Sequence, residues 1–229
     1  LQVPFDRSLG RPAVDRMHLM PFLLPTNFCD SENAAIRTLA HELIPAGTSA
    51  EEAAKMVRAW VRREITYTLD VKDTTASQTL RSREGMCTNK ANLQVAIMRA
   101  AGVPAGFVMC HVTKEAFKSE HILEELYATI SDPTIHCFCA VYIPEFQSFR
   151  NYDATEKSRE SPAHNKLLAE DPDTGETTYQ PKWLRGPFGP VQANLDHLLS
   201  YVFPSRISDQ LRDKQNALYR KYKEIYRAK

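Results

Sequence analysis

The feature that most constrains the fold of this chain is an apolar segment bounded by glycine and proline. Residues 88–101, TNKANLQVAIMRAA, are apolar on most faces of a helix, which is typical of a central buried helix rather than a surface helix. Gly102 and Pro104 follow and predict its end. Cys87 directly precedes the segment, two residues after Gly85. The sequence therefore predicts a core helix whose first turn carries a cysteine thiol.

The pattern after this helix changes to that of short strands. Residues 105–112 and 136–143 are rich in strand formers, and 148–155 reads as a third strand. The turn at 144–147 joins the last two, which indicates an antiparallel hairpin. Because side chains alternate along a strand, one face should carry His136, Phe138, Ala140 and Tyr142, and the core face Cys137, Cys139, Val141 and Ile143. Together with the helices, this small antiparallel sheet predicts an α+β fold.

The segments before the core helix carry proline and helix-start signals. Residues 1–28 contain several prolines and few periodic signals, which predicts an extended arm. Asp30–Ser31 are suited to cap a first helix. Ser49 and Glu52 fit a capping box that begins a second helix with an apolar stripe. The core helix is thus expected to have two amphipathic helices before it in the chain.

Two regions lie outside these core elements. The insert at 113–135 separates the first two strands, contains one helical face, and has a length typical of a lid or binding segment. Residues 156–190 are polar and turn-rich, and helical patterns follow at 191–202 and 206–227. The last segment is basic and interleaved with tyrosines. We interpret it as a packing helix rather than a nucleic-acid patch.

Length and charge limit the organisation and the partners. A chain of 229 residues predicts one domain spanning 1–229, with its core at about 22–155, an extended arm at 1–21, and a C-terminal loop and helical extension at 156–229. Lys and Arg number 29 against 28 Asp and Glu, a net charge of +1. This balance gives no reason to expect nucleic acid or an anionic membrane as a partner. A small-molecule or protein substrate remains open.

Membrane and redox signals point to a reducing compartment. No window holds the roughly 18 consecutive apolar residues of a membrane span, and the N-terminus lacks the pattern of a signal peptide. The five cysteines are odd in number and have no framework-like spacing, which favours reduced thiols over disulfides. We therefore expect a cytoplasmic location.

Cys87 becomes a candidate nucleophile when it is considered with one histidine and one aspartate. Free thiols are mostly protonated at neutral pH, since their pKa is about 8.5, so a nucleophilic cysteine needs a group that favours its thiolate. The positive end of a helix dipole and an imidazole both do this. Cys87 sits at a helix start, and His136 begins its strand at a sheet end, where we expect its side chain to lie open to a cleft.

Asp153 is the candidate third group. A catalytic imidazole needs a neighbour that fixes its tautomer and holds its ring. The hairpin brings residues 136–138 opposite roughly 152–155, so His136 and Asp153 become candidate cross-strand neighbours. Taken alone, Asp153 also fits a turn-forming residue beside Ala154 and Thr155.

These ordered motifs resemble a known family. The set GMCTNKANLQVAIMRAAGVPAGF, then HCFCAVYI, then NYDAT is similar to the transglutaminase-like superfamily of papain-related cysteine enzymes, and the similarity covers about residues 22–155. The resemblance implies a papain-like fold in which Cys87 is the nucleophile, His136 the general base and acid, and Asp153 the orienting carboxylate. It implies an acyl-enzyme formed from a small-molecule or peptide donor, with water or an amine as acceptor. No metal or organic cofactor is required.

Details of the motif differ from the family pattern. Thr88 stands where many members carry an aromatic residue after the cysteine. The backbone N–H of Cys87 is one candidate oxyanion donor, and Gln78 is a second candidate from its position upstream. The stretch REGMC is also similar to the Arg-Gly-Gly-x-Cys motif of arylamine N-acetyltransferases, although Glu84 replaces the first glycine.

Other readings are weaker but distinct. Cysteines and histidines are the preferred ligands of zinc, yet Cys137 and Cys139 are expected on the strand face opposite His136 and have no CxxC partner. A transglutaminase-like binding module without turnover is the main alternative to an enzyme. Among enzymes, a cysteine peptidase or amidase and an arylamine N-acetyltransferase-like acetyltransferase remain open, as does the choice between hydrolysis and amide formation.

Overall fold

The computed structural model describes residues 5–6, 11–12, 16–69, 73–118, 121–155, 168–171, 174–199 and 207–227. Parts of the predicted arm and all of 156–167 lie outside the described residues. Strands β1 (Phe5–Asp6) and β2 (Arg11–Pro12) pair with each other. The arm is not extended over residues 16–22, which form α1 (Arg16–Leu19) and the 3-10 helix η1 (Met20–Phe22). Proline near the start of η1 is compatible with a helical turn, because the N–H that it lacks has no helical acceptor there.

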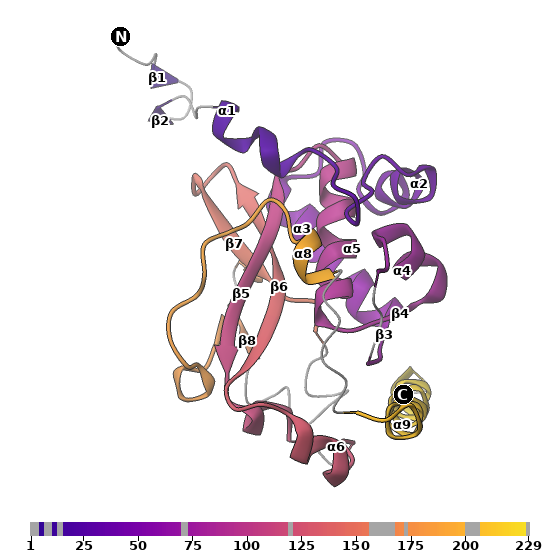
Figure 1. Cartoon of the computed structure of the whole chain (residues 1–229). Coiled ribbons are helices and arrows are strands. Elements are labelled where there is room, and N and C mark those ends of the chain that lie inside the picture. The colour runs from indigo at the N-terminus through magenta and orange to yellow at the C-terminus, as the bar shows by residue number, and fades with distance from the viewer. Residues whose placement is uncertain are drawn as a thin grey trace.

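One central helix lies between other helices and the sheet, as Figure 1 shows. The central helix is α5 (Cys87–Ala100), buried along nearly its whole length, which confirms the predicted core helix. The elements before it in the chain are α2 (Ala34–Leu43), α3 (Ala50–Glu64), β3 (Thr66–Tyr67), α4 (Ala76–Ser82) and β4 (Glu84–Gly85). Helices α2, α3 and α4 all contact α5. The parallel pair β3 and β4 lies at its N-terminal end.

The first two helix starts differ in how well they follow the sequence signals. Ser49 caps α3 as predicted, its hydroxyl accepting from the N–H of Glu52 at 3.2 Å. Helix α2 is capped by Asn33 rather than by Asp30–Ser31. The carboxylate of Asp30 instead accepts from the backbone N–H of Ser77 at 3.0 Å, on the distant helix α4. A long-range contact therefore replaced the local cap that the sequence favoured.

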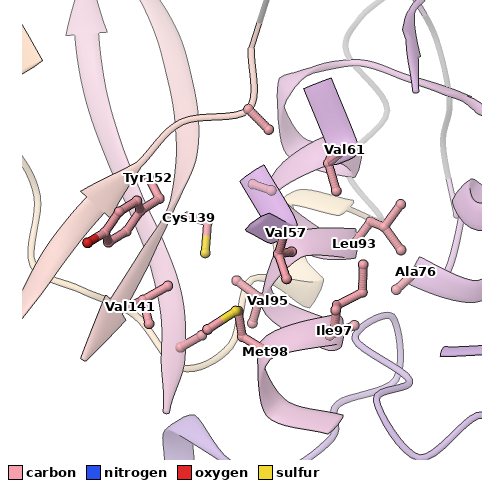
Figure 2. Packing of buried hydrophobic residues seen from close by; sticks show 14 of the residues in the cluster. Val57, Val61, Ala76, Leu93, Val95, Ile97, Met98, Cys139, Val141 and Tyr152 are labelled. Carbon is pink, nitrogen blue, oxygen red and sulfur yellow. The ribbon is translucent and has the colours of Figure 1, made fainter. Parts of the chain in front are cut away.

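The central sheet contains three antiparallel strands in the order β5-β6-β7. They are β5 (Ala105–Val112), β6 (Thr134–Ile143) and β7 (Ser148–Tyr152). The core face of β6 packs on α5, and Figure 2 shows Val95 and Met98 of the helix among Cys139, Val141 and Tyr152. The predicted strands and the predicted core face of β6 are confirmed. The third strand ends at Tyr152 rather than at residue 155.

Polar side chains on α5 bind the backbone of the segments around it. Lys90 donates to the carbonyl of Ile65 at 3.0 Å. Gln94 donates to the carbonyl of Tyr152 at 3.1 Å, and Asn92 and Arg99 likewise bind backbone carbonyls of other segments. All four side chains are buried. The central helix is thus held in place by hydrogen bonds as well as by apolar packing, and these bonds satisfy side-chain N–H groups that burial would otherwise penalise.

The C-terminal part covers both edges of the sheet. The hairpin β8 (Leu168–Glu170) and β9 (Thr177–Tyr179) lies beside β7. After η3 (Pro181–Trp183), residues 184–192 run along the outer edge of β5 through backbone bonds between Phe107 and Gln192, at 2.8 Å in both directions. Covering an edge strand in this way removes a template for aggregation.

The insert and the last helix contact one another. The insert forms η2 (Lys114–Phe117) and α6 (Glu124–Thr129). The C-terminal part, after η3, forms α8 (Asp196–Leu199) and α9 (Asp209–Arg227). Gln215 of α9 is buried and bridges the insert, accepting from the N–H of Leu123 at 2.8 Å and donating to the carbonyl of His121 at 2.6 Å. Helix α9 is therefore a packing helix, although the helix predicted over 191–202 is confined to 196–199 in the described residues.

Two findings bear on the compartment. All five cysteines are free thiols, as predicted. Within the described ranges, no helix combines the length and the apolar character needed to cross a membrane. The cytoplasmic location and the single-domain division stay predictions.

Candidate active site

The fold places Cys87 at the first position of α5, next to a tight entry. A Cβ atom added at Gly85 would lie 2.6 Å from the Cβ of Asn89, closer than real contacts allow. Asn89 is buried, and its side-chain oxygen accepts from the backbone N–H of Met86 at 3.1 Å. Glycine is therefore required before the helix for steric reasons. The side chain of Cys87 is 8% exposed, so the thiol lies just beneath the surface.

His136 and Asp153 form a fully buried pair. The Nε2 atom of His136 lies 2.6 Å from Oδ2 of Asp153, with the two side chains 0% and 1% exposed. Burial opposes the charged imidazole. The charge and hydrogen bond of Asp153, followed by those of Cys87, nevertheless raise the pKa of His136 well above its usual range. Asp153 and, less strongly, Cys87 therefore both act on the imidazole of His136.

The second ring nitrogen of His136 identifies the side of the ring that is left for the thiol. Within the described part of the chain, Nδ1 is buried and has no hydrogen-bond partner of strict geometry. Cys87 is the second side chain that raises the pKa of His136. Nδ1 is the ring nitrogen that the contact with Asp153 leaves available.

Asp153 is fixed by several hydrogen bonds. Its Oδ2 accepts from the hydroxyl of Tyr179 and its Oδ1 from the backbone N–H of Thr155, both at 2.6 Å. Its own N–H donates to the hydroxyl of Thr177 at 3.0 Å. Burial alone would raise the pKa of Asp153, but His136 and these donors hold it well below its usual range. The carboxylate is thus kept ionised in a dry environment.

The sheet register explains how His136 and Asp153 meet. His136 pairs with Cys110 of β5. On the other side, β6 and β7 pair through Cys139 and Tyr152, and Asp153 lies one residue past the end of β7. Continuing this register sets Asp153 opposite Phe138, so its contact with His136 is diagonal rather than directly cross-strand.

The expectation that His136 lies open to a cleft is wrong. The ring is fully buried because aromatic side chains surround it: Phe117 of the insert at a ring-centroid distance of 6.4 Å, Phe138 at 6.0 Å and Tyr179 at 6.2 Å. Phe188 packs edge-on against Phe138 and Tyr179 and is 39% exposed. Packed aromatic rings therefore connect the buried imidazole to the partly exposed Phe188.

The remaining cysteines are buried thiols. Burial raises the pKa of Cys29 to about 12 and that of Cys110 to about 11. It also raises the pKa values of Cys137 and Cys139 far above the usual range. Groups of three or more His, Cys, Asp or Glu suited to a metal ion are absent from the residues that the structure describes.

Gln78, the second candidate oxyanion donor, lies at the start of α4, and its role as a donor stays a prediction. The side chain is exposed, and its oxygen accepts from the N–H of Thr75 at 2.8 Å in the capping box of α4. Its carbonyl group is therefore committed to the helix start. Tyr179 and Thr177, which hold Asp153, were missed by the sequence reading because a three-residue strand in a polar region has no periodic signal.

Comparison with known proteins identifies the family. The family model described as the transglutaminase-like superfamily matches residues 37–154, just over half of the chain. No curated protein matches. Among solved structures, the chain is similar to a candidate cysteine protease from Cytophaga hutchinsonii, with 23% identity over 60% of this chain and 42% of that one, and a TM-score of 0.47.

A second similar structure is the periplasmic domain of TgpA from Pseudomonas aeruginosa bound to ethylmercury. Identity is 23% over 64% of this chain and 51% of that one, with a TM-score of 0.43. A candidate protease from Parabacteroides distasonis gives 14% identity over 56% of this chain and 25% of that one, with a TM-score of 0.39. The chain spans between a quarter and about half of the length of these structures.

Proposed function

The chain belongs to the transglutaminase-like superfamily, and from that premise we propose that it is a cysteine-nucleophile acyl-transfer enzyme. Cys87 is the nucleophile, His136 the general base and acid, and Asp153 the orienting carboxylate. The observation that carries the proposal is the buried 2.6 Å contact between His136 and Asp153, with Cys87 as the other side chain acting on the imidazole.

The first half of the reaction forms the acyl-enzyme. The thiol proton of Cys87 passes to Nδ1 of His136, which gives a thiolate–imidazolium pair. The thiolate sulfur of this pair attacks the carbonyl carbon of an amide, ester or thioester. The resulting oxyanion is stabilised by the backbone N–H of Cys87 at the positive end of α5. The imidazolium then protonates the leaving amine, alcohol or thiol as its bond to carbon breaks, which leaves a thioester on the enzyme.

The second half transfers the acyl group. Water or an amine loses its proton to the neutral imidazole of His136 and attacks the thioester. The sulfur leaves as a thiolate beside the imidazolium, so the thiolate–imidazolium pair is restored. Asp153 keeps Nε2 protonated throughout and so holds Nδ1 toward the thiol. Hydrolysis and amide formation share every residue and differ in whether the acceptor is water or an amine.

A non-catalytic transglutaminase-like binding module is the alternative. The 8% exposure of Cys87 is the observation in its favour, since a nucleophile must meet its substrate. The charged environment of His136 and Asp153 favours the enzyme, because an ionised buried pair stabilises a fold less than an apolar replacement of the same size.

Intact-mass spectrometry after exposure to a panel of acyl donors tests the proposal. The panel contains p-nitrophenyl esters, aryl thioesters and small peptide amides. We expect one acyl adduct per chain, located on Cys87 by peptide mapping, and none in Cys87→Ala. Cys29→Ala is the matched control, because Cys29 is also a buried free thiol but lies in the apolar core; this variant should acylate normally.

Two further readouts complete the test. Added methylamine or glycinamide should shorten the life of the adduct and appear in the product if the enzyme forms amides, whereas a hydrolase should give only the free acid. Failure of every donor to acylate a folded wild-type chain would favour the binding module.

A further inference from the structure

We propose that Tyr179 is a positioning residue that holds the carboxylate of Asp153 and limits how strongly it attracts the proton of His136. This inference rests on the proposed function, since it concerns the same triad. Tyr179 lies outside residues 37–154, the segment matched by the family model. The C-terminal extension would then supply part of the catalytic machinery rather than only a cover.

The geometry gives Tyr179 and His136 the same acceptor. The tyrosine hydroxyl and Nε2 of the imidazole each lie 2.6 Å from Oδ2 of Asp153. Tyr179 is 8% exposed and Asp153 is 1% exposed, so water has little access to either group. When two donors share one carboxylate oxygen in a dry site, each of them reduces the negative charge that the other can attract.

The hairpin that carries Tyr179 has anchors besides its bonds to Asp153. Glu176 binds β7 through an ion pair with Arg150 at 2.9 Å and accepts from the N–H of Asn151 at 3.3 Å. The carbonyl of Gly175 accepts from Arg58 of α3 at 2.5 Å. The position of the Tyr179 hydroxyl is therefore supported by contacts with β7 and α3 in addition to the contact between Thr177 and Asp153.

Several titratable groups lie near this carboxylate and imidazole. They are Cys87 from α5, Cys110 from β5 and Tyr179 from β9, together with Cys137, which lies on the face of β6 opposite to His136. Arg62 of α3 donates to the backbone carbonyl of Asp153 at 2.9 Å. Burial and the neighbouring Asp153 raise the pKa of Tyr179 well above its usual range, so the phenol stays protonated and remains a donor.

The pH dependence of Cys87 carboxymethylation by iodoacetate tests the proposal without a known substrate. The rate should rise as the thiolate–imidazolium pair forms. It should fall as His136 loses its proton, because the reagent's carboxylate is attracted to the imidazolium. In Tyr179→Phe, Asp153 keeps its charge with one donor fewer and attracts the imidazolium more strongly. We therefore expect the falling limb, which is the decrease of the rate at high pH, to shift to higher pH by roughly half to one pH unit.

The matched control is Tyr142→Phe, which also removes the hydroxyl of a buried tyrosine near the sheet, but one that packs on Phe149. Its falling limb should coincide with that of the wild type. An unchanged or lowered limb in Tyr179→Phe would overturn the role of Tyr179 while leaving the triad intact. A wild-type profile without a falling limb would refute the ion pair of the proposed function, and with it this role.

A second variant covers the case in which Tyr179→Phe fails to fold. Site-specific replacement of Tyr179 by 3-fluorotyrosine keeps the ring and makes the hydroxyl a stronger donor. Asp153 then attracts the imidazolium less, so the falling limb should move to lower pH. If Tyr179 acts through the shared oxygen of Asp153, the two substitutions should shift the pH at which the rate falls in opposite directions. A loss of packing would leave that pH unchanged in both variants. A shift of the same sign in both variants would overturn the proposal.

Discussion

Gly85→Ala should strain the start of α5 and displace the candidate nucleophile. Gly85 does not have a left-handed backbone conformation, so alanine is excluded by space alone. The new Cβ would lie 2.6 Å from the Cβ of Asn89, and ordinary contact begins at 3.4 Å. Because the Cβ of Asn89 is fixed to the helix backbone, β4 and α5 must separate by roughly 0.8 Å.

The cost follows from two contributions. Overpacking a tight contact costs about 1–3 kcal/mol. Separation also weakens the bond from the N–H of Met86 to Asn89, a helix-start interaction worth about 1 kcal/mol. We expect the free energy of unfolding to fall by about 2–4 kcal/mol, measured by urea denaturation. If Cys87 is the nucleophile, its acylation rate should also fall by about 10- to 100-fold, because the reacting atoms are misplaced.

A double-mutant cycle isolates the steric cause. Asn89→Gly removes the Cβ that alanine would strike, at the cost of the cap. On that background, Gly85→Ala should cost less than about 1 kcal/mol. An equal cost on both backgrounds, or a cost below about 0.5 kcal/mol in the single variant, would refute the reasoning.

Three further predictions concern stability. Gln215→Leu leaves two backbone groups of the insert unpaired and should cost about 1–3 kcal/mol, with faster proteolysis of the insert; a resistant insert would contradict this. Gly106→Ala sets a Cβ 2.8 Å from the carbonyl oxygen of Gln192 and should lower the free energy of unfolding by about 1–3 kcal/mol, measured by thermal or urea unfolding. Gly189→Ala sets its Cβ 3.3 Å from the carbonyl oxygen of Met109 and should cost clearly less. The lowered pKa of Asp153 gives stability that is present above about pH 4 and lost as pH falls, and the raised pKa of His136 gives stability that is present below about pH 6.5 and lost as pH rises. The stability that Asp153→Asn loses should therefore be greatest between about pH 4 and 6.5 in urea denaturation, and a loss independent of pH would contradict the assignment.

The sequence predicted the elements whose signals are local. The boundaries of α5 and β5 follow from an apolar period between glycines and from a run of strand formers. The two faces of β6 follow from strict alternation. These patterns follow from the local geometry of helix and strand and from the residues that bound them, so they can be read without the rest of the fold.

What the sequence did not reveal depends on distant contacts. Asp30 was expected to cap α2 but binds Ser77 of α4. His136 was expected to be exposed but is covered by Phe117, which lies in the insert, and by Tyr179, which follows it by more than forty residues. Local periodicity in the sequence does not predict which loop side chains will cover the end of a strand. The surroundings of the candidate site are therefore known only from the structure.

The polar side chains of α5 have a consequence for how sequences of this kind diverge. Lys90, Asn92, Gln94 and Arg99 bind carbonyl oxygens, which every amino acid carries. Residues of the neighbouring segments can therefore be substituted without loss of the hydrogen bonds that hold the helix, provided that the path of the main chain is kept. Substitution should accumulate around the helix faster than at its four anchoring positions.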